Sequence, residues 1–140
     1  MKLKIKRLDK TVNLPDIARQ WDVGFDLRSG EDVILKSGEK KIIGTGLSLA
    51  VPVGYAGLVW DRSGMAGNHS IHILAGVIDP GFRGEIGVVM INLGKEEFRI
   101  EKNMKIAQIL IHQIFIPEIV EVEDLDDTER GDNWLWSSGK

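Results

Sequence analysis

Residues 106–116 read IAQILIHQIFI, and this stretch decides the expected fold. Isoleucine and leucine occupy both of its alternating faces, a pattern typical of a strand that lies between two apolar layers. Short runs rich in isoleucine, valine and leucine recur between glycines, prolines and charged residues, at 33–35, 42–51, 56–60, 70–78, 86–93, 98–100 and 119–122. These runs predict an all-β protein, a sandwich or barrel of antiparallel strands of jelly-roll type. Little helix is expected, and the best candidate is residues 63–68.

The composition is that of one ordinary globular domain, with 140 residues, 43% hydrophobic and 28% charged. No apolar stretch approaches the roughly 20 residues of a membrane span, and the alternating start MKLKIKR has no apolar core for a signal peptide. We therefore expect a cytoplasmic protein with no membrane partner. The absence of cysteine excludes disulfides, thiolate metal sites and a cysteine nucleophile. The net charge of −3 argues against stable nucleic-acid binding, so an anionic ligand would need a few well-placed cations.

The C-terminal part of the chain differs from the rest in composition. We therefore divide the whole chain into a β-barrel core (1–116), an acidic spacer (117–129) and a C-terminal lid segment (130–140). Pro117 ends the last long apolar run, and residues 118–129 then contain seven acidic residues and no basic one. Trp134 and Trp136 follow within the final segment. Large apolar rings gain nothing on a solvated tail. We therefore expect residues 130–140 to dock on the chain's own body, on a neighbouring subunit or on a bound ligand.

The strongest local motif is GVIDPGFRGE, residues 76–85. Asp79 ends an apolar run and begins a turn whose next residues, Pro80 and Gly81, favour a type II turn. At the mouth of a packed strand pair the carboxylate would be partly desolvated and could deprotonate a water as a general base. Phe82 would offer a flat apolar face just beyond it. Taken alone, the same residues fit an aspartate that only caps a hairpin.

Two further motifs carry charge. In DRSGMAG, residues 61–67, a strand runs into small residues, which can present backbone N–H groups at the start of a helical turn. Arg62 adds a guanidinium that can bind phosphate through two parallel hydrogen bonds. Asp22 and Asp26 lie four residues apart and could hold a hydrated Mg²⁺, or be a solvated loop.

In order along the chain, these segments resemble the five motifs of the homotrimeric dUTPase family. The matching stretches are residues 24–27, 62–66, 76–85, 105–108 and 130–139. Each is a moderately weak motif, but five in family order and at family spacing make one strong signal. The short link between Ser63 and Asp79 and the RGDN at 130–133 are most similar to the compact retroviral-type members.

The resemblance implies a dUTPase-like β-clip, a homotrimer with exchanged C-terminal tails, and sites between subunits. It implies Mg²⁺-assisted hydrolysis of dUTP to dUMP and pyrophosphate, which keeps uracil out of DNA and supplies dUMP for dTMP synthesis. Asp79 would activate the water that attacks the α-phosphorus, and Phe82 would pack under the deoxyribose. Asp26 would reach Mg²⁺ through water. Before the last motif, the other implied substrate contacts are Arg62, Ser63, Gly64 and Gln108 for phosphate, and the backbone of the hairpin containing Leu74, Gly76 and Val77 for uracil.

The last motif implies a lid over the β- and γ-phosphates, supplied by a neighbouring subunit through Arg130, Ser137 and Ser138. Leu135 takes the position of the family's uracil-stacking aromatic but cannot stack, and Trp134 and Trp136 replace the usual glycines. Either a tryptophan takes over the stacking, or the lid closes differently, or closure is impaired.

Two other positions depart from the family pattern. Phe82 replaces the usual tyrosine, which keeps the ring but loses a phenol hydrogen bond. Asp61 stands beside Arg62, where an uncharged residue is common, and is expected to pair with that arginine and weaken its hold on phosphate.

Two other functions compete with dUTP hydrolysis. The dCTP deaminase family shares the fold but needs a glutamate where this chain has Val89, so deamination is not expected. A non-catalytic dUTPase-like module that binds a nucleotide or a protein partner is the other alternative, because the altered last motif could serve binding alone.

Overall fold

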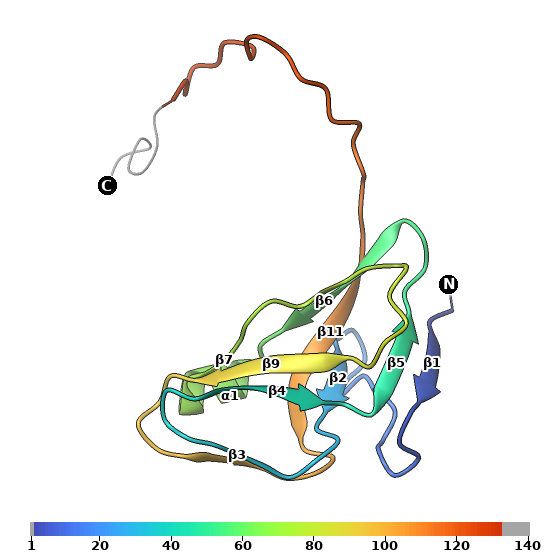
Figure 1. The fold of residues 1–140 in the computed structure, drawn as a ribbon, viewed down its shortest axis with the longest axis vertical. Helices are drawn as coiled ribbons and strands as arrows, with labels where there is room; N and C mark the ends of the chain where they lie inside the picture. Colours follow the sequence, from blue (N-terminus) through green and yellow to red (C-terminus); the bar gives the residue numbers. More distant parts are fainter. Residues whose placement is uncertain (1, 133–140) are drawn as a thin grey trace.

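The computed structural model describes residues 2–132 and consists of short antiparallel strands with a single short helix in that range (Figure 1). The helix is α1 (Ser63–His69), where the sequence predicts one. The strands are β1 (Lys4–Arg7), β2 (Phe25–Arg28), β3 (Val33–Leu35), β4 (Lys40–Gly44), β5 (Leu47–Ala50), β6 (Tyr55–Trp60), β7 (Ile71–Ile73), β8 (Val77–Ile78), β9 (Gly87–Asn92), β10 (Phe98–Ile100) and β11 (Lys105–Gln113).

Two main sheets and two small ribbons make up the body. The larger sheet has the order β2-β11-β6-β8 and the other main sheet β4-β9-β7, while β1 pairs with β5 and β3 with β10. Every pairing is antiparallel, as expected of a jelly-roll-like barrel. The helix α1 lies at the end of the body where β9 ends, and the loop that leads into β9 lies at the opposite end (Figure 1).

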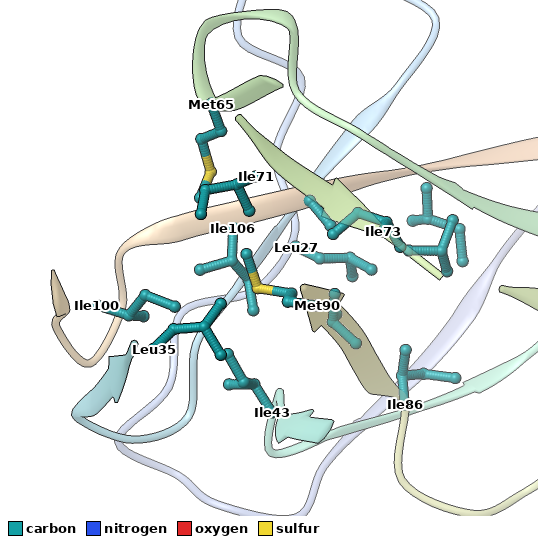
Figure 2. Packing of buried hydrophobic residues seen from close by; sticks show 14 of the residues in the cluster. Leu27, Leu35, Ile43, Met65, Ile71, Ile73, Ile86, Met90, Ile100 and Ile106 are labelled. Atoms are coloured by element: carbon teal, nitrogen blue, oxygen red, sulfur yellow. The ribbon is translucent and has the colours of Figure 1, made fainter. Parts of the chain in front are cut away.

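The core lies between the main sheets and is almost entirely aliphatic. Leu27 and Ile106 come from the larger sheet and meet Ile43 and Met90 of the other, each no more than 1% exposed (Figure 2). Burying each such side chain contributes about 1.5–3 kcal/mol. Since consecutive short strands cannot stand alone, this shared core is what fixes the relative positions of the motifs.

Two expected strands are each divided by a turn. The run 42–51 breaks between β4 and β5 at Gly46, whose φ is +66° and where a Cβ would lie 3.0 Å from Val12 Cγ1. The run 70–78 breaks between β7 and β8, because Ala75 and Gly76 have φ of +59° and +132°. The strands β1 and β2 were not among the expected runs, since both mix apolar and charged residues.

The chain leaves the body after β11, which ends at Gln113 rather than at residue 116. Residues 114–132 form an extended arm that rises away from the sheets (Figure 1). The strand predicted at 119–122 is absent, because none of the strands within residues 2–132 lies beside the arm to share hydrogen bonds with it. Ile116 and Ile119 are 84% and 94% exposed there. None of the helices in the described range is long and apolar enough to cross a membrane.

Candidate active site

Three of the motifs meet on the neighbouring strands β2, β11 and β6 of the larger sheet. In the register of that sheet Gln108 on β11 is paired with Asp26 on β2 and with Trp60 on β6, the strand that leads into Arg62. Residues far apart in the sequence therefore gather where these three strands run side by side. We call Asp26, Arg62, Lys105 and Gln108 the polar cluster.

Asp26 is the buried centre of this cluster, with 6% of the residue exposed. Its Oδ1 accepts a hydrogen bond from Arg62 Nε at 3.1 Å, and its Oδ2 forms an ion pair with Lys105 Nζ. Arg62 Nη1 also donates to the carbonyl of Lys105 at 3.3 Å. Two cations thus compensate the charge of one buried carboxylate. Removing one partner of such a buried ion pair would leave an unpaired charge and destabilise the fold. The guanidinium, with 35% of its side chain exposed, remains half open to a ligand.

A bulge in β11 makes the cluster possible. Lys105 and Gln108 are three positions apart, a spacing that would place their side chains on opposite faces of a regular strand. The register with β2 shifts between Lys105 and Ala107, so one extra residue is accommodated there. As a result the consecutive Ile106 and Ala107 both enter the core, at 1% and 0% exposure, while Lys105 and Gln108 share the polar side. Lys105 was not assigned a role from the sequence, because the motif reveals the lysine but not the bulge.

The side chain of Gln108 is held by its neighbours. Its Nε2 donates to the carbonyl of Asp61 at 2.8 Å, which ties β11 to the end of β6. A Cβ on Gly24 would collide with Gln108 Oε1, so the glycine of the first motif leaves the space that the amide occupies. This explains in packing terms why a glycine precedes Phe25 and Asp26.

Asp61 does not pair with Arg62, contrary to the expectation from the sequence. Its Oδ2 lies 2.8 Å from His72 Nδ1, and its Oδ1 accepts a hydrogen bond from the Ile73 amide at 2.6 Å. Neighbouring side chains leave an extended backbone on opposite sides. Asp61 therefore faces β7 while Arg62 faces Asp26, and the arginine is not neutralised by the residue beside it.

The helix α1 follows directly from the cluster. Arg62 is extended (φ −91°, ψ 127°) and its carbonyl accepts the amides of Met65 and Ala66. Met65 is 6% exposed and points toward Ile71 in the core (Figure 2), which anchors the helix. Ser63 and Gly64 are exposed beside Arg62. The segment 62–64 is thus an exposed turn, held in place by the buried Met65 that follows it and by the bond from Arg62 to Asp26.

The Asp79 turn, residues 79–84, has a different character. The amide of Phe82 donates to the carbonyl of Asp79 at 3.1 Å, which confirms a turn at the expected residues. It is not type II, because Gly81 lacks the positive φ that such a turn requires; proline at the second position suits a type I turn as well. Arg83 Nη1 donates to the carbonyls of Pro80 and Phe82, both at 2.6 Å, and braces the turn.

The side chain of Asp79 is exposed in the single chain, so the expectation of partial desolvation is wrong for one protomer. Nothing from the chain's own strands covers it, because the turn projects beyond β8. Phe82 is 42% exposed and its ring lies over Gly84, where a Cβ would be 2.6 Å from Cζ. The flat ring face is therefore present beside the carboxylate, as the sequence suggests.

The Asp79 turn and the polar cluster lie far apart within one chain. β8 pairs with β6 through Ile78 and Gly57, so Asp79 lies beyond the level of Gly57, while Arg62 lies past the other end of β6. At about 3.3 Å per residue this separation is roughly 15–20 Å. One protomer therefore carries two separate groups of motif residues rather than one closed site.

The sequence predicts a hairpin at residues 74–77. The structure instead has a crossover there between the two main sheets. The Leu74 amide donates to Val89 on β9, and the carbonyl of Gly76 accepts the amide of Val59 on β6, both at 2.8 Å. A Cβ on Gly76 would lie 2.9 Å from Val59 Cβ, so only glycine fits this close approach. Those two backbone groups are already bonded within the chain, while Val77, 66% exposed, stays on the surface.

The described residues contain no group of three His, Cys, Asp or Glu side chains that could enclose a metal ion. Asp26 contributes one carboxylate, and both of its oxygens face cations. Oδ2 is fully buried in the single chain, so a bridging water would be accepted by the second lone pair of Oδ1. This donor set fits Mg²⁺ bound chiefly by ligand phosphates and its own waters, and does not fit a complete protein cage.

The last motif is only partly visible. Arg130 is exposed near the end of the arm, whereas Leu135, Ser137 and Ser138, together with Trp134 and Trp136, lie outside the described residues.

Comparisons with known proteins agree with this arrangement. The sequence model of the dUTPase family matches residues 10–139. The deoxyuridine 5'-triphosphate nucleotidohydrolases of Nautilia profundicola and Clostridium kluyveri are 47% and 48% identical to the chain, over 100% and 99% of both sequences. A solved dUTPase of Staphylococcus bacteriophage 80alpha with dUpNHpp superposes with a TM-score of 0.94 at 30% identity and 99% coverage of both chains. A dUTPase of phage phi11 with a structural Mg(II) ion gives 0.84 at 27%, covering 89% of this chain and 98% of that one.

The fold and the motif residues thus define an all-β protein of jelly-roll type in which three separate sequence motifs meet in one polar cluster. More specifically, the chain belongs to the dUTPase family.

Proposed function

We propose that the protein hydrolyses dUTP to dUMP and pyrophosphate, which removes a source of uracil in DNA and supplies dUMP for dTMP synthesis. Family membership and full-length relatives named as dUTP nucleotidohydrolases support this activity. The observation that carries it is the meeting of Asp26, Arg62 and Gln108 in one polar cluster, since three distant motifs have no structural need to converge there.

In the proposed reaction Asp79 acts as general base. Its carboxylate takes a proton from a water as the water oxygen attacks the α-phosphorus. The bond from that phosphorus to the bridging oxygen breaks, and pyrophosphate leaves. Such a step needs positioning and charge neutralisation rather than a covalent intermediate. The exposed Asp79 suits this role, because its carboxylate has access to water.

Phosphate oxygens would be bound by Arg62, Ser63, Gly64 and Gln108 at the polar cluster. The half-exposed guanidinium provides the main charge, and the fixed turn at 62–64 sets its direction. Magnesium, held by phosphate oxygens and its own waters with Asp26 reached through a water, would neutralise further phosphate charge. Phe82 would pack under the deoxyribose, and the backbone groups of residues 74–77 that remain unpaired would read uracil.

We further propose that the working site forms between copies of a homotrimer. The roughly 15–20 Å between Asp79 and Arg62 in one chain is too long for both to serve one α-phosphate, since catalytic contacts act at hydrogen-bond range. An Asp79 turn from one copy would therefore face the polar cluster of another. The exposed apolar residues of the arm, such as Ile116 and Ile119, fit a chain that is covered by a neighbour.

In this assembly the arm 117–129 would act as a spacer, and residues 130–140 as a lid from a neighbouring copy. Arg130, Ser137 and Ser138 would close over the β- and γ-phosphates, with Leu135 near uracil. A lid of this kind excludes water from the triphosphate. A cytoplasmic location belongs to the same proposal, and a composition without cysteine is compatible with a reducing compartment.

The alternatives have less support. Val89, at the position where deaminases need a glutamate, gives no carboxylate, and its carbonyl is occupied by the Leu74 amide. A non-catalytic module would explain the unusual last motif but not the presence of both Asp79 and the polar cluster.

A pyrophosphate-release assay with dUTP, dCTP, dTTP and UTP, with and without magnesium, tests the proposal. We expect turnover of dUTP far above the other three and dependent on magnesium. Ammonia release from dCTP would favour a deaminase, and tight binding of dUTP without turnover would favour a binding module.

A further inference from the structure

The Asp61 carboxylate joins the end of β6 to β7. Its two oxygens serve two different partners, His72 Nδ1 at 2.8 Å and the backbone amide of Ile73 at 2.6 Å. Ile73 is 7% exposed and belongs to the core through β7. The carboxylate is therefore anchored to a fixed part of the molecule rather than to a mobile surface group.

These bonds join the two ends of the loop 61–70, at a place that we call the neck of the loop: Asp61 at its start and residues 72 and 73 after it. The chain leaves β6 at Trp60, forms α1, and returns as β7 at Ile71, so the segment 61–70 is attached to the sheets at its two ends. Asp61 connects those ends directly by reaching across eleven and twelve positions of sequence to residues 72 and 73. Without this link, the loop's first residues would be held only on the side of β2 and β11, by Gln108 on the Asp61 carbonyl and by Arg62 on Asp26 and on the Lys105 carbonyl, and no longer on the side of β7.

The residues next to the neck are those proposed to bind phosphate. Arg62 follows Asp61 and reaches Asp26, while the Asp61 carbonyl receives Gln108 Nε2 at 2.8 Å. Asp61 thus makes three hydrogen bonds that together set where Arg62 and Gln108 lie. Its side chain is 29% exposed and that of His72 51%, so the pair lies at the rim and not in the core.

We propose that Asp61 and His72 are positioning residues for triphosphate binding, with Asp61 fixing the segment 62–64 and His72 fixing Asp61. This rests on the proposed function and adds to it the reason why a carboxylate is tolerated beside the phosphate-binding arginine. The carboxylate is directed to β7, where hydrogen bonds to His72 and to the Ile73 amide hold it, so its cost to phosphate binding is outweighed by the fixed geometry it gives Arg62.

The test compares Asp61→Ala with Asp61→Asn in the full chain. Alanine removes both side-chain hydrogen bonds, whereas asparagine can accept from the Ile73 amide and donate to His72 Nδ1 in its other tautomer. We expect Asp61→Ala to weaken binding of dUpNHpp roughly tenfold, the cost of one to two such bonds, and Asp61→Asn to stay within about threefold of the wild type. His72→Phe should weaken binding by a few-fold and serves if Asp61→Ala does not fold.

The phosphate-free nucleoside 2′-deoxyuridine separates positioning from general damage. Its inhibition constant should change much less in Asp61→Ala than the binding of dUpNHpp does, because the nucleoside makes none of the phosphate contacts proposed for Arg62 and Gln108. The matched control is Asp32→Ala, which removes a carboxylate that accepts a backbone amide, that of Lys102 at 2.8 Å, away from the cluster. It should leave binding of both ligands as in the wild type.

The inference is overturned if Asp61→Ala binds dUpNHpp as the wild type does, or if 2′-deoxyuridine binding falls by the same factor. Tighter binding by Asp61→Asn than by the wild type would also overturn it, since the carboxylate would then act only as an opposing charge. A wild type that neither binds dUpNHpp nor hydrolyses dUTP would instead contradict the proposed function.

Discussion

The polar cluster and the Asp79 turn carry carboxylates in opposite settings. Asp26 is 6% exposed and shared by Arg62 and Lys105, on strands of the larger sheet. Asp79 is exposed, on a turn whose hydrogen bonds are made by its own residues and Arg83. A carboxylate bound to cations organises a site, whereas one left in water can exchange protons. In the proposed function, phosphate binding and water activation therefore belong to two separate regions at opposite ends of β6.

The largest effect should follow from Asp79→Asn. Loss of a general base costs about 10²–10⁴-fold in rate, so we expect kcat for dUTP to fall about a thousandfold. Binding of dUpNHpp should stay within a few-fold and the melting temperature unchanged, because the side chain is exposed. Normal turnover by this variant would show that Asp79 is not the base.

Co-expression of two inactive variants tests whether one active site combines the Asp79 turn of one copy with the polar cluster of another. Asp79→Asn and Arg62→Gln are expected to be inactive alone. After co-expression, random assortment of copies should restore about a quarter of the sites if each site takes Asp79 from one chain and Arg62 from another. Pyrophosphate release measures the recovery. A mixture as inactive as its parents would mean that both residues must come from one chain.

The next effect concerns the cluster as a structural element. Asp26→Ala leaves Arg62 and Lys105 without their shared anion, and we expect a loss of about 2–4 kcal/mol in the free energy of unfolding. Asp16→Ala is the matched control, because Asp16 is an exposed carboxylate that lies 3.4 Å from Arg28 and 3.9 Å from Lys105. Exposed pairs contribute little, so its denaturation midpoint should barely move. Equal losses in the two variants would contradict the special role of burial.

The smallest effect is expected at Asp9, an exposed carboxylate outside both regions. Lys102 Nζ at 2.8 Å, and the hydroxyl and amide of Thr11, hold the pKa of Asp9 well below its ordinary value of 3.8. A pKa lowered by folding stabilises the folded state above pH 3.8, and this contribution is lost as the pH falls further. The melting temperature of Asp9→Asn should therefore be slightly below that of the wild type at pH 7, with the difference vanishing in acid. A constant difference down to pH 2 would rule out ionisation as its cause.

Much of the fold follows from local pattern. The apolar runs predict most strands of both main sheets, and the small residues after Arg62 predict α1. The strand predictions that were wrong depended on backbone geometry and on strand pairing, which the order of apolar residues does not reveal. The positive φ at Gly46 and Gly76 divides two expected strands, and the run 119–122 has no strand within residues 2–132 to pair with.

The site shows the same division. The motif residues were found by their order in the sequence, and the structure then places Asp26, Arg62 and Gln108 together. The direction of Asp61 could not be predicted, because it depends on the return of the chain at His72. Lys105 was overlooked because its face is decided by a bulge, and the exposure of Asp79 depends on what lies outside one protomer.

The bulge in β11 also has an evolutionary consequence. Ile106 is the additional residue, so deleting it would restore a regular strand with Lys105 and Gln108 still on the polar side, but it would remove from the core an isoleucine that is 1% exposed. Substitutions in this segment can be tolerated one at a time, but a change in its length cannot. We therefore expect insertions and deletions among descendants of this gene to spare the stretch from Asn103 to Gln108 and to accumulate in the exposed arm instead.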